Sequence, residues 1–320
     1  MKRIEKRGKL GVMGILRKYK YAYILITPAI LLTIVFRYLQ FGGLIIAFKE
    51  FTFEDVFKDP NVFKAIWKST WVGLDNFIHV FSYPKMLLAI KNTLIYGFFN
   101  LVLGFPFPII LALLFNELRN LRFKKVVQTV SYMPHFLSWI SVIGLCYSML
   151  ALEGPINQFL VKIFGEGISY SDPLMDANCF LPVIFLSNIW KNVGWSSVVF
   201  LAAIAGIDTT LYEAAKVDGC GKFRQVLNIT LPCISETIII VFIMSAGQLV
   251  NTNFEQVYGF QNIFTQEKTE VINTLVYRQG IQNGQYDIAT AFGLVQGIVN
   301  VSLILGANAI SKKLKGTSIW

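Results

Sequence analysis

Residues 180–206 read FLPVIFLSNIWKNVGWSSVVFLAAIAG, an apolar block of 27 residues in which Lys191 is the single charged side chain. A helix needs about 20 mainly apolar residues to cross the hydrocarbon core of a bilayer, which is roughly 30 Å thick. The block is therefore long enough to span a membrane, and we predict that it forms a transmembrane helix.

Five more apolar blocks flank the quoted one. The 320-residue chain is 54% hydrophobic and 15% charged, whereas an ordinary soluble domain has roughly 25% charged residues. A soluble helical protein would show polar residues every second turn, and whole stretches of this chain lack them. We predict an all-α integral membrane protein with about six transmembrane helices, at Tyr23–Phe48, Leu87–Phe115, Val127–Leu150, Phe180–Gly206, Cys233–Phe254 and Ile288–Ile310.

The charges between the blocks predict the orientation. Residues 1–22 carry eight basic side chains against Glu5, and residues 311–320 carry three lysines and no acid. The connection after the second block is also basic, whereas residues 49–86 carry five basic and five acidic side chains and residues 151–179 are acidic. Basic loops stay on the cytoplasmic side of a membrane. The alternation therefore predicts an even number of spans with both termini in the cytoplasm.

These patterns divide the chain into parts. We expect a basic cytoplasmic segment at 1–22, a first transmembrane helix at 23–48, an extracellular or interfacial segment at 49–86, a five-helix core at 87–310 and a basic cytoplasmic tail at 311–320. The net charge of +10 is spread over short loops and forms no single stripe, which argues against a nucleic-acid partner. The four cysteines show neither metal-ligand spacing nor a disulfide framework, so we predict no metal site.

The cytoplasmic connection that follows the quoted block, at about 207–232, differs from the others. Thr210 is followed three residues later by Glu213, a capping box that predicts a helix start, and Gly219 can end that helix in a left-handed conformation. The expected helix has about two turns. Its small side chains would suit docking into a groove on another protein, with charged groups at the rim. A plain cytoplasmic loop with one helical turn fits these residues equally well.

Glu213-Ala214-Ala215, Asp218-Gly219 and Leu231-Pro232 resemble the EAA loop of the permeases of ABC importers. The usual alanine after the glycine is replaced by Cys220. Further stretches resemble a carbohydrate group, the LplB-like and maltose-type membrane subunits; these stretches are Phe36-Arg37-Tyr38, Leu44 to Lys49, Trp71 to Phe77 and Asn92-Thr93-Leu94.

The resemblance implies a type I (MetI-like) permease core in a bacterial inner membrane and a function in binding-protein-dependent carbohydrate uptake. It implies four kinds of partner: a cytoplasmic ABC ATPase dimer that binds ATP and Mg, a second and non-identical permease subunit, an extracellular solute-binding protein, and a carbohydrate substrate. The sequence itself leaves open whether the second subunit is a copy. The residues that would contact the ATPase are Thr210, Tyr212, Glu213, Ala214, Ala215, Asp218, Gly219 and Pro232.

Polar residues within the spans predict where a substrate passes, because such residues tend to face a bundle interior or a water-filled path. Asn188, Asn192 and Trp195 fall on one face of the fourth span. Amides can bind sugar hydroxyls and aromatic rings can cover the apolar sugar face, although these amides could equally tie helices together. With the resemblance, the candidate path comprises Asn188, Lys191, Asn192, Trp195, Gln248, Asn251, Thr252, His135 and Trp139.

The chain lacks the residues of an ATPase or of another enzyme. Gly221-Lys222 is followed by Phe223 and has no preceding glycine of a phosphate-binding loop. We therefore predict no catalytic residue and no cofactor in this chain. The alternatives are a self-contained secondary transporter or channel, which would need ionisable residues in the middle of several spans, and a membrane-embedded enzyme, which would need a catalytic constellation.

Overall fold

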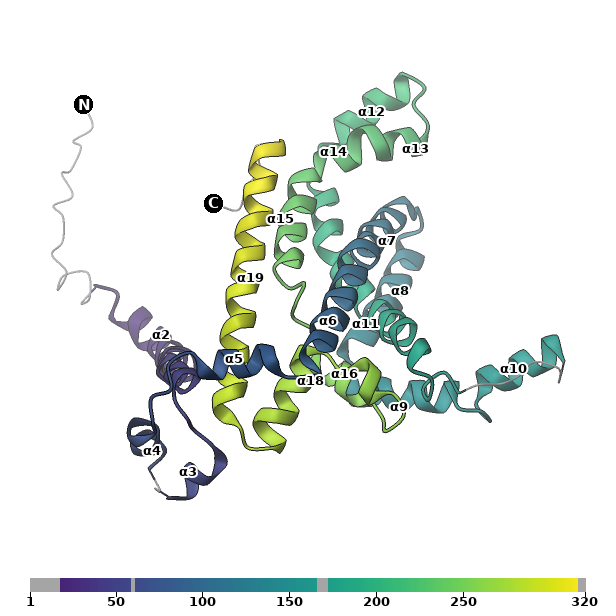
Figure 1. Cartoon of the computed structure of the whole chain (residues 1–320). Helices are drawn as coiled ribbons and strands as arrows, with labels where there is room; N and C mark the ends of the chain where they lie inside the picture. The colour runs from purple at the N-terminus through teal and green to yellow at the C-terminus, as the bar shows by residue number, and fades with distance from the viewer. Residues whose placement is uncertain (1–17, 59–60, 166–171, 316–320) are drawn as a thin grey trace, which may run out of the picture.

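The fold is all-α, as predicted. A computed structural model describes residues 18–58, 61–165 and 172–315 (Figure 1), so parts of the predicted basic termini, at 1–17 and 316–320, lie outside the described residues. Among the residues described, the only β pairing is an isolated bridge between Lys49 and Trp71. Within the described ranges, four helical segments are long and apolar enough to cross a membrane, and up to six if two bent pairs each count as one span.

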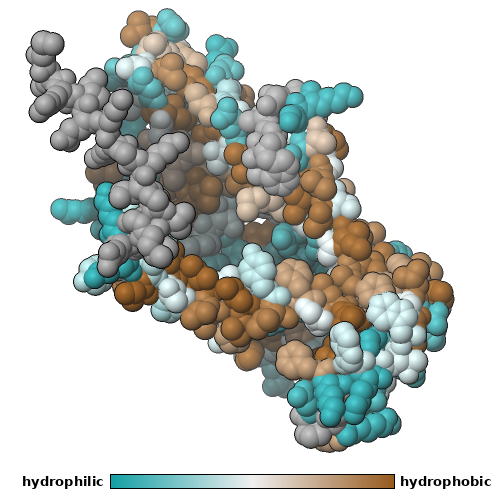
Figure 2. Space-filling view, turned by 90° about the vertical axis from the view of Figure 1, so that its left-hand side faces the viewer, coloured by the Kyte–Doolittle hydropathy of each residue, from teal (hydrophilic) through white to brown (hydrophobic). Residues whose placement is uncertain are grey.

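The first span is α2 (Lys20–Thr33), continued by η1 (Ile34–Tyr38) and η2 (Leu39–Phe48). No side chain of α2 or η1 is buried within the described chain, whereas η2 packs against α19 (Tyr286–Lys315). Apolar side chains that no protein covers are typical of a lipid-facing helix. Figure 2 shows the side of the molecule that lies to the left in Figure 1. Hydrophobic side chains cover much of the middle of this side, and hydrophilic ones gather at its lower edge.

The segment at 49–86 folds into three short helices, α3 (Phe53–Lys58), α4 (Val62–Lys68) and α5 (Asp75–Ser82). Its start is held by Lys49, which is buried and donates hydrogen bonds to the carbonyls of Ile66, Trp67 and Ser69 at 2.8, 2.9 and 3.0 Å. The side chain of Trp67 remains 79% exposed. The prediction that this segment is extracellular or interfacial stays a prediction.

The second span consists of α6 (Met86–Phe99), the π-helical turn η3 (Asn100–Gly104) and α7 (Pro106–Glu117). Pro106 and Pro108 lie in the first turn of α7, where a missing N–H costs little. Together the three elements form one candidate span of 32 residues. The predicted span is therefore confirmed within one residue at its start and two at its end.

The prediction of a continuous third span at Val127–Leu150 is wrong. The chain forms α8 (Leu121–Tyr132) and the 3₁₀ turn η4 (Met133–Phe136), and a helix resumes only at α9 (Trp139–Leu150), followed by α10 (Pro155–Phe164). Pro134 has no N–H to continue an α-helix, and Leu137 is extended (φ −72°, ψ 143°). The helical stretch that passes the length and hydropathy test is Trp139–Phe164.

The fourth span is α11 (Ala177–Ala205), which bends by 71° into α12 (Thr209–Val217). The chain returns through α13 (Lys222–Gln225), η5 (Val226–Thr230) and α14 (Leu231–Cys233), and bends by 64° into α15 (Ser235–Ala246). The fifth span was predicted to reach Phe254, which is wrong. The helix ends at Ala246, residues 247–250 form a turn, and residues 251–253 have no regular structure.

The remaining elements are α16 (Phe254–Phe260), α17 (Gln266–Thr269), α18 (Ile272–Val276), η6 (Tyr277–Gln282) and α19, which confirms and extends the predicted sixth span. In Figure 1, α12 and α13 lie at the same end of the molecule as the C-terminal end of α19, which we name the α12 end. Elements α3, α4, α16 and α18 lie toward the opposite end, the α16 end. Which side of a membrane each end occupies stays a prediction.

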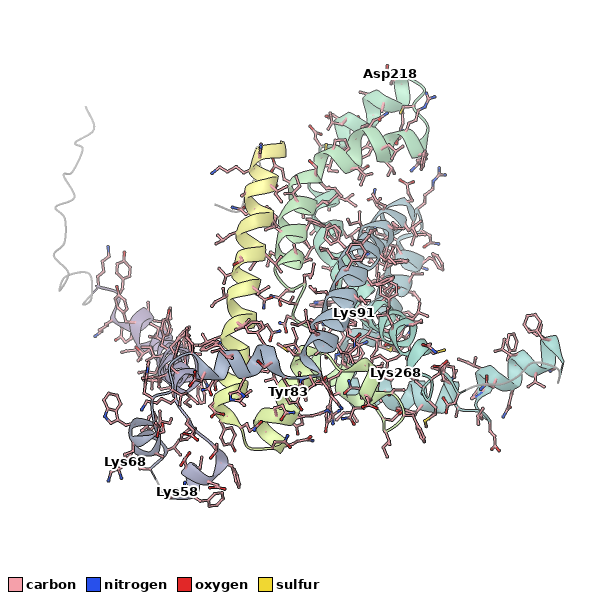
Figure 3. All side chains as sticks on the ribbon, in the orientation of Figure 1. Lys58, Lys68, Tyr83, Lys91, Asp218 and Lys268 are labelled. Carbon is pink, nitrogen blue, oxygen red and sulfur yellow. The ribbon has the colours of Figure 1, made fainter. Side chains whose placement is uncertain are left out.

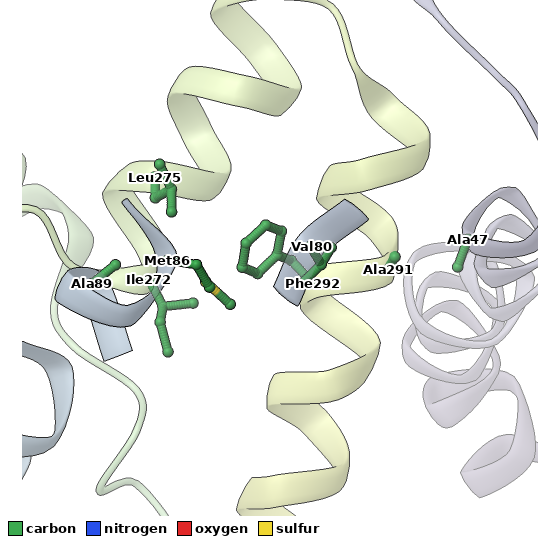
Figure 4. Packing of buried hydrophobic residues seen from close by; sticks show 8 residues of the cluster. All are labelled: Ala47, Val80, Met86, Ala89, Ile272, Leu275, Ala291 and Phe292. Atoms are coloured by element: carbon green, nitrogen blue, oxygen red, sulfur yellow. The ribbon is translucent and has the colours of Figure 1, made fainter. Parts of the chain in front are cut away.

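A hydrophobic cluster near the α16 end joins the first span and the 49–86 segment to the core. It contains Ala47 from η2, Val80 from α5, Met86 and Ala89 from α6, Ile272 and Leu275 from α18, and Ala291 and Phe292 from α19 (Figure 4). All of these side chains are at most 8% exposed. The cluster fixes α5 across α19, so the 49–86 segment is part of the folded unit.

Two glycines allow the backbones of separate segments to approach closely. A Cβ on Gly194 of α11 would lie 2.0 Å from the carbonyl oxygen of Ser131 in α8, and one on Gly97 of α6 would lie 1.9 Å from that of Leu249. Both distances are far below any tolerated contact, so a glycine is needed at each position. In the last span, by contrast, a Cβ on Gly293 or Gly297 would meet nothing within 4 Å.

Candidate functional site

The connection between α11 and α15 begins with a well-formed helix cap. Asp208 precedes α12, and its carboxylate accepts a hydrogen bond of 2.9 Å from the backbone N–H of Thr210. The predicted capping box from Thr210 to Glu213 is therefore wrong, because the cap is Asp208, two residues earlier than Thr210. The hydrogen bond from the Thr210 backbone also holds the pKa of Asp208 below its ordinary value. The helix expected from the sequence is present, with nine residues.

The end of α12 confirms the prediction for Gly219. This residue has φ +73°, in the left-handed region that favours glycine. The N–H of Gly219 donates to the carbonyl of Lys216 at 3.1 Å, and the N–H of Cys220 donates to that of Ala215 at 2.8 Å. This pair of bonds is a Schellman motif, which ends the helix and reverses the chain toward α13.

The reversed chain is fixed to the bundle at two places. The hydroxyl groups of Tyr212 and Thr230 form a 2.9 Å hydrogen bond, so α12 is tied to the end of η5. Lys222 at the start of α13 forms a 2.5 Å ion pair with Glu117 at the end of α7. The loop is thus a folded element in contact with the second span.

Several side chains of this element remain uncovered by the described chain. Thr210, Glu213, Ala214, Asp218, Gly219 and Pro232 are exposed, whereas Tyr212 and Ala215 are half-buried. Val217 is 89% and Leu211 46% exposed, although both are apolar. Asp218 lies at the far tip of the α12 end (Figure 3). A short capped helix that presents small, apolar and acidic side chains outward is suited to docking on another protein.

A cavity of about 820 Å³ lies between the second, fourth and fifth spans. Four of the nine residues predicted for a substrate path line it, namely Asn188, Asn192, Gln248 and Asn251. Asn253, another polar residue of the predicted fifth span, lines it as well. Sequence reasoning missed the contribution of the second span and several small polar residues, which are Tyr96, Asn100, Ser196, Thr237 and Ser245. Among the residues that the structure describes, no charged side chain lines this cavity.

The amides on one wall form a chain of hydrogen bonds. Asn188 donates to Asn100, and Asn192 donates to Asn188, each at 2.7 Å. His135 lies 3.1 Å from the side-chain oxygen of Asn192 and stacks on Trp195 with ring centroids 5.0 Å apart. Thus His135 and Trp195 support the amide chain from outside the cavity lining.

Lys191 and Trp139 lie outside the cavity lining, beside the break between α8 and α9. The ammonium group of Lys191 donates to the carbonyls of His135 at 2.7 Å and Leu137 at 2.5 Å, and lies 3.5 Å from that of Pro134. It also lies 5.4 Å from the ring centroid of Trp139. Both side chains are 6% exposed. Lys191 thus pairs the carbonyl groups that the break between α8 and α9 leaves without helical partners.

At the break after α15, side chains likewise donate hydrogen bonds to backbone carbonyls. Gln296 of α19 donates to the carbonyl of Val250 at 2.8 Å, and Asn273 of α18 donates to that of Thr252 at 2.6 Å. The side chain of Thr252 is 3% exposed, and its hydroxyl has no hydrogen-bond partner among the described residues. Irregular backbone at membrane depth is tolerated where protein satisfies it or where it lines a cavity, and both conditions hold here.

A second cavity, of about 850 Å³, lies in the 49–86 segment between α3, α4 and the turn at 283–285. It is slightly larger, and charged side chains such as Glu50, Asp55 and Lys58 line it. The hydrogen bond from the Thr52 backbone lowers the pKa of Asp55. Because this cavity lies outside the helices that could span a membrane, it is not a candidate for the path between them.

Comparison with known proteins agrees with this arrangement. Residues 92–316 match the family model described as binding-protein-dependent transport system inner membrane component. The chain is 40% identical to the protein LplB of Bacillus subtilis over 94% of this chain and 91% of LplB. It is 39% identical to the polygalacturonan/rhamnogalacturonan transport system permease protein YteP of the same organism, over 99% of this chain and 94% of YteP.

Solved structures show the same fold. A bacterial ABC transporter involved in the import of the acidic polysaccharide alginate contains a chain that is 34% identical, with a TM-score of 0.83 over 95% of this chain and 99% of that chain. A second structure matches with the same TM-score and identity. In it, the bacterial alginate ABC transporter is in complex with an alginate pentasaccharide-bound periplasmic protein.

Proposed function

Because the chain belongs to the family of binding-protein-dependent transport system inner membrane components and is a permease subunit of a sugar ABC importer, we propose that it imports oligosaccharides and is coupled to a separate ATPase through the loop at 207–232. The observation that carries this proposal is the pairing of two features in one chain. A folded docking element lies at the α12 end, and an uncharged, amide-lined cavity lies between the spans.

The coupling step follows from the geometry of the loop. The exposed face of α12 would sit against a cytoplasmic ABC ATPase dimer, which binds ATP and Mg. Closure of the ATPases would displace α12, and the ion pair between Lys222 and Glu117 offers a direct contact from the loop to α7. Because η3, which carries Asn100 of the cavity lining, leads into α7, motion of α7 would reach the cavity. In this proposed orientation, both termini would lie in the cytoplasm.

The substrate path would run through the cavity. Asn188, Asn192, Gln248 and Asn251 line it, and side-chain amides bind sugar oxygens by hydrogen bonds. The wall that this chain supplies is one side of the path, and a second, non-identical permease subunit would supply the other. His135, Trp139, Lys191, Trp195 and Thr252 would act by supporting the lining, since none of them lines the cavity.

Delivery of the substrate would come from an extracellular solute-binding protein at the α16 end. The relative whose structure is a complex has a periplasmic protein carrying an oligosaccharide. The 49–86 segment and the loops around α16 and α18 form this end in Figure 1. A self-contained secondary transporter would have no use for the binding protein or for an exposed docking helix.

Reconstitution in proteoliposomes tests the proposal. The chain is assembled with its ATPase, its second permease subunit and its binding protein, and uptake of a labelled oligosaccharide is measured. We expect uptake that requires ATP and the binding protein and that persists when ionophores collapse the ion gradients. Uptake driven by an ion gradient without ATP would contradict the proposal and favour the secondary-transporter alternative.

A further inference from the structure

The segment that follows α15, residues 247–260, folds across one side of the cavity, and we name it the return segment. Its first part, 247–253, is a turn and an irregular stretch, and its second part is α16. Four residues of the first part line the cavity, namely Gln248, Leu249, Asn251 and Asn253. None of residues 254–260 lines it. Three side chains of α16 are instead at most 1% exposed, those of Gln256, Val257 and Phe260.

The cavity ends where the return segment packs against the neighbouring helices. On α11 the lining begins at Asn188, whereas Ile184 and Ser187, which precede it toward the α16 end, are buried. On α6 the lining begins at Tyr96, although the helix starts at Met86. Both helices run from the α16 end toward the α12 end (Figure 1). A substrate arriving from the α16 end would therefore meet the return segment before it reached the cavity.

The first contact that closes this side is between backbones. A Cβ on Gly97 of α6 would lie 1.9 Å from the carbonyl oxygen of Leu249 and 2.8 Å from its carbonyl carbon. Both atoms belong to the main chain, which cannot rotate aside as the end of a flexible side chain can. The return segment therefore reaches its present position only because residue 97 has no side chain.

The second contact is a buried amide. The side chain of Gln256 in α16 is 0% exposed. Its nitrogen donates to the carbonyl of Ile184 at 2.7 Å and to the hydroxyl of Ser187 at 3.0 Å. Its oxygen accepts from the hydroxyl of Tyr96 at 2.8 Å. One side chain thus ties α16 to both α6 and α11, and separating these elements would leave several buried groups without partners.

The return segment is also the wall of the cavity with the least regular backbone. The second and fourth spans pass the cavity as helices, whereas residues 251–253 have no regular structure. This stretch is held by side chains, through the bonds from Gln296 to the carbonyl of Val250 and from Asn273 to that of Thr252. Hinges occur at loop or element-terminal residues that absorb changes in backbone dihedral angles. Of the cavity walls, this one is therefore best suited to move.

We propose that the return segment is this chain's part of a gate at the α16 end of the cavity, and that Gly97 and Gln256 hold it closed. The structure shows the closed position. Opening withdraws Leu249 from Gly97 and Gln256 from Tyr96, which admits substrate to the cavity. This inference rests on the proposed function, since a gate here has a use only if substrate enters from the α16 end. It goes beyond that function by assigning the part that moves.

Cysteine accessibility in intact cells that lack the solute-binding protein tests the gate. Ser245 lines the cavity, and Ser245→Cys is introduced into a chain whose four native cysteines are replaced, assembled with its second permease subunit and ATPase. A small membrane-impermeant methanethiosulfonate is added outside, and the labelling rate is measured. We expect Gly97→Ala to raise this rate by about ten-fold, because the added Cβ overlaps Leu249 only in the closed position.

Gly104→Ala is the matched control, because Gly104 lines the same cavity from the same span. The nearest atom that its Cβ would meet, the side-chain oxygen of Asn100, is 3.6 Å away, which is an ordinary contact. We expect this variant to leave the labelling rate unchanged. Tyr96→Phe adds no atom and removes one hydrogen bond of Gln256, so we expect a rise of about five-fold. This second variant decides the matter if Gly97→Ala does not assemble with the ATPase.

Labelling rates that are equal in the unaltered chain and in the assembled variants Gly97→Ala and Tyr96→Phe would overturn the gate. An equal rise in Gly104→Ala and Gly97→Ala would overturn it too, because the overlap with Leu249 would then be irrelevant. Either result would leave the import path intact as long as the unaltered complex shows ATP-dependent uptake. Absence of that uptake would overturn the proposed function itself.

Discussion

Replacing Gly219 with valine is expected to reduce ATP-driven uptake by about ten-fold or more, while the membrane spans remain folded. The residue has φ +73°, a conformation that costs a non-glycine side chain about 1–3 kcal/mol and a β-branched one the most. The strain falls on the Schellman motif that directs the chain from α12 into α13. Displacing that turn would move Lys222 away from Glu117 and disturb the surface offered to the ATPase. Uptake and co-purification of the ATPase are the measurements.

Gly221 provides a matched control two residues away. It has φ −69° and ψ 162°, and a Cβ there would meet nothing within 4 Å. We expect Gly221→Val to keep most of the uptake and Gly219→Asn to keep part of it, because asparagine tolerates the left-handed region. If the two valine variants transported equally well, the geometry of this turn would be irrelevant to coupling.

Replacing Lys191 with methionine is expected to destabilise the whole subunit. Methionine fills a similar volume but cannot donate to the carbonyls of His135 and Leu137, which the helix break leaves without other partners. Each unsatisfied buried polar group costs about 1–3 kcal/mol. In a chain of this size we expect the melting temperature in detergent to fall by about 5–10 °C, as followed by loss of tryptophan fluorescence or by aggregation.

Lys162→Met on α10 is the control, because Lys162 is exposed, and its melting temperature should remain within about 2 °C of that of the unaltered chain. The amount of folded Lys191→Met protein in the membrane should fall in parallel. A melting temperature unchanged in Lys191→Met would show that the carbonyls find water or other donors, and the structural role assigned to this lysine would be wrong.

The helical membrane fold could be predicted because bilayer thickness demands long apolar blocks. The second and sixth spans agree with the structure to within a few residues, apart from the extension of α19 to Lys315. The breaks after Tyr132 and Ala246 were missed because each lies within a longer block that was counted as one apolar span. Pro134 marked the first break. The second depends on Gln296 and Asn273, whose amides reach residues 250–252 only in the folded chain.

The candidate site could be predicted in part for a similar reason. Rare polar residues within a span pointed to Asn188, Asn192, Gln248 and Asn251, all of which line the cavity, and the same rule applied to the second span would have found Asn100. Their role in a substrate path stays a prediction. The rule does not say which way a side chain points. Lys191 lies one residue from Asn192, yet a helix turns about 100° per residue and directs the Lys191 side chain toward α9.

The start of α12 was misplaced because both Asp208 and Thr210 are good caps, and the sequence does not rank them.

The most direct test of the account is the sidedness of the exposed loop helix. Ala214 is exposed on α12, and Ala214→Cys in a variant whose four native cysteines are replaced can be labelled with a membrane-impermeant maleimide. We predict labelling in inside-out vesicles stripped of the ATPase, protection when the ATPase is added back, and no labelling in intact cells. Labelling of intact cells from outside would place this helix on the extracellular surface and contradict its role in coupling.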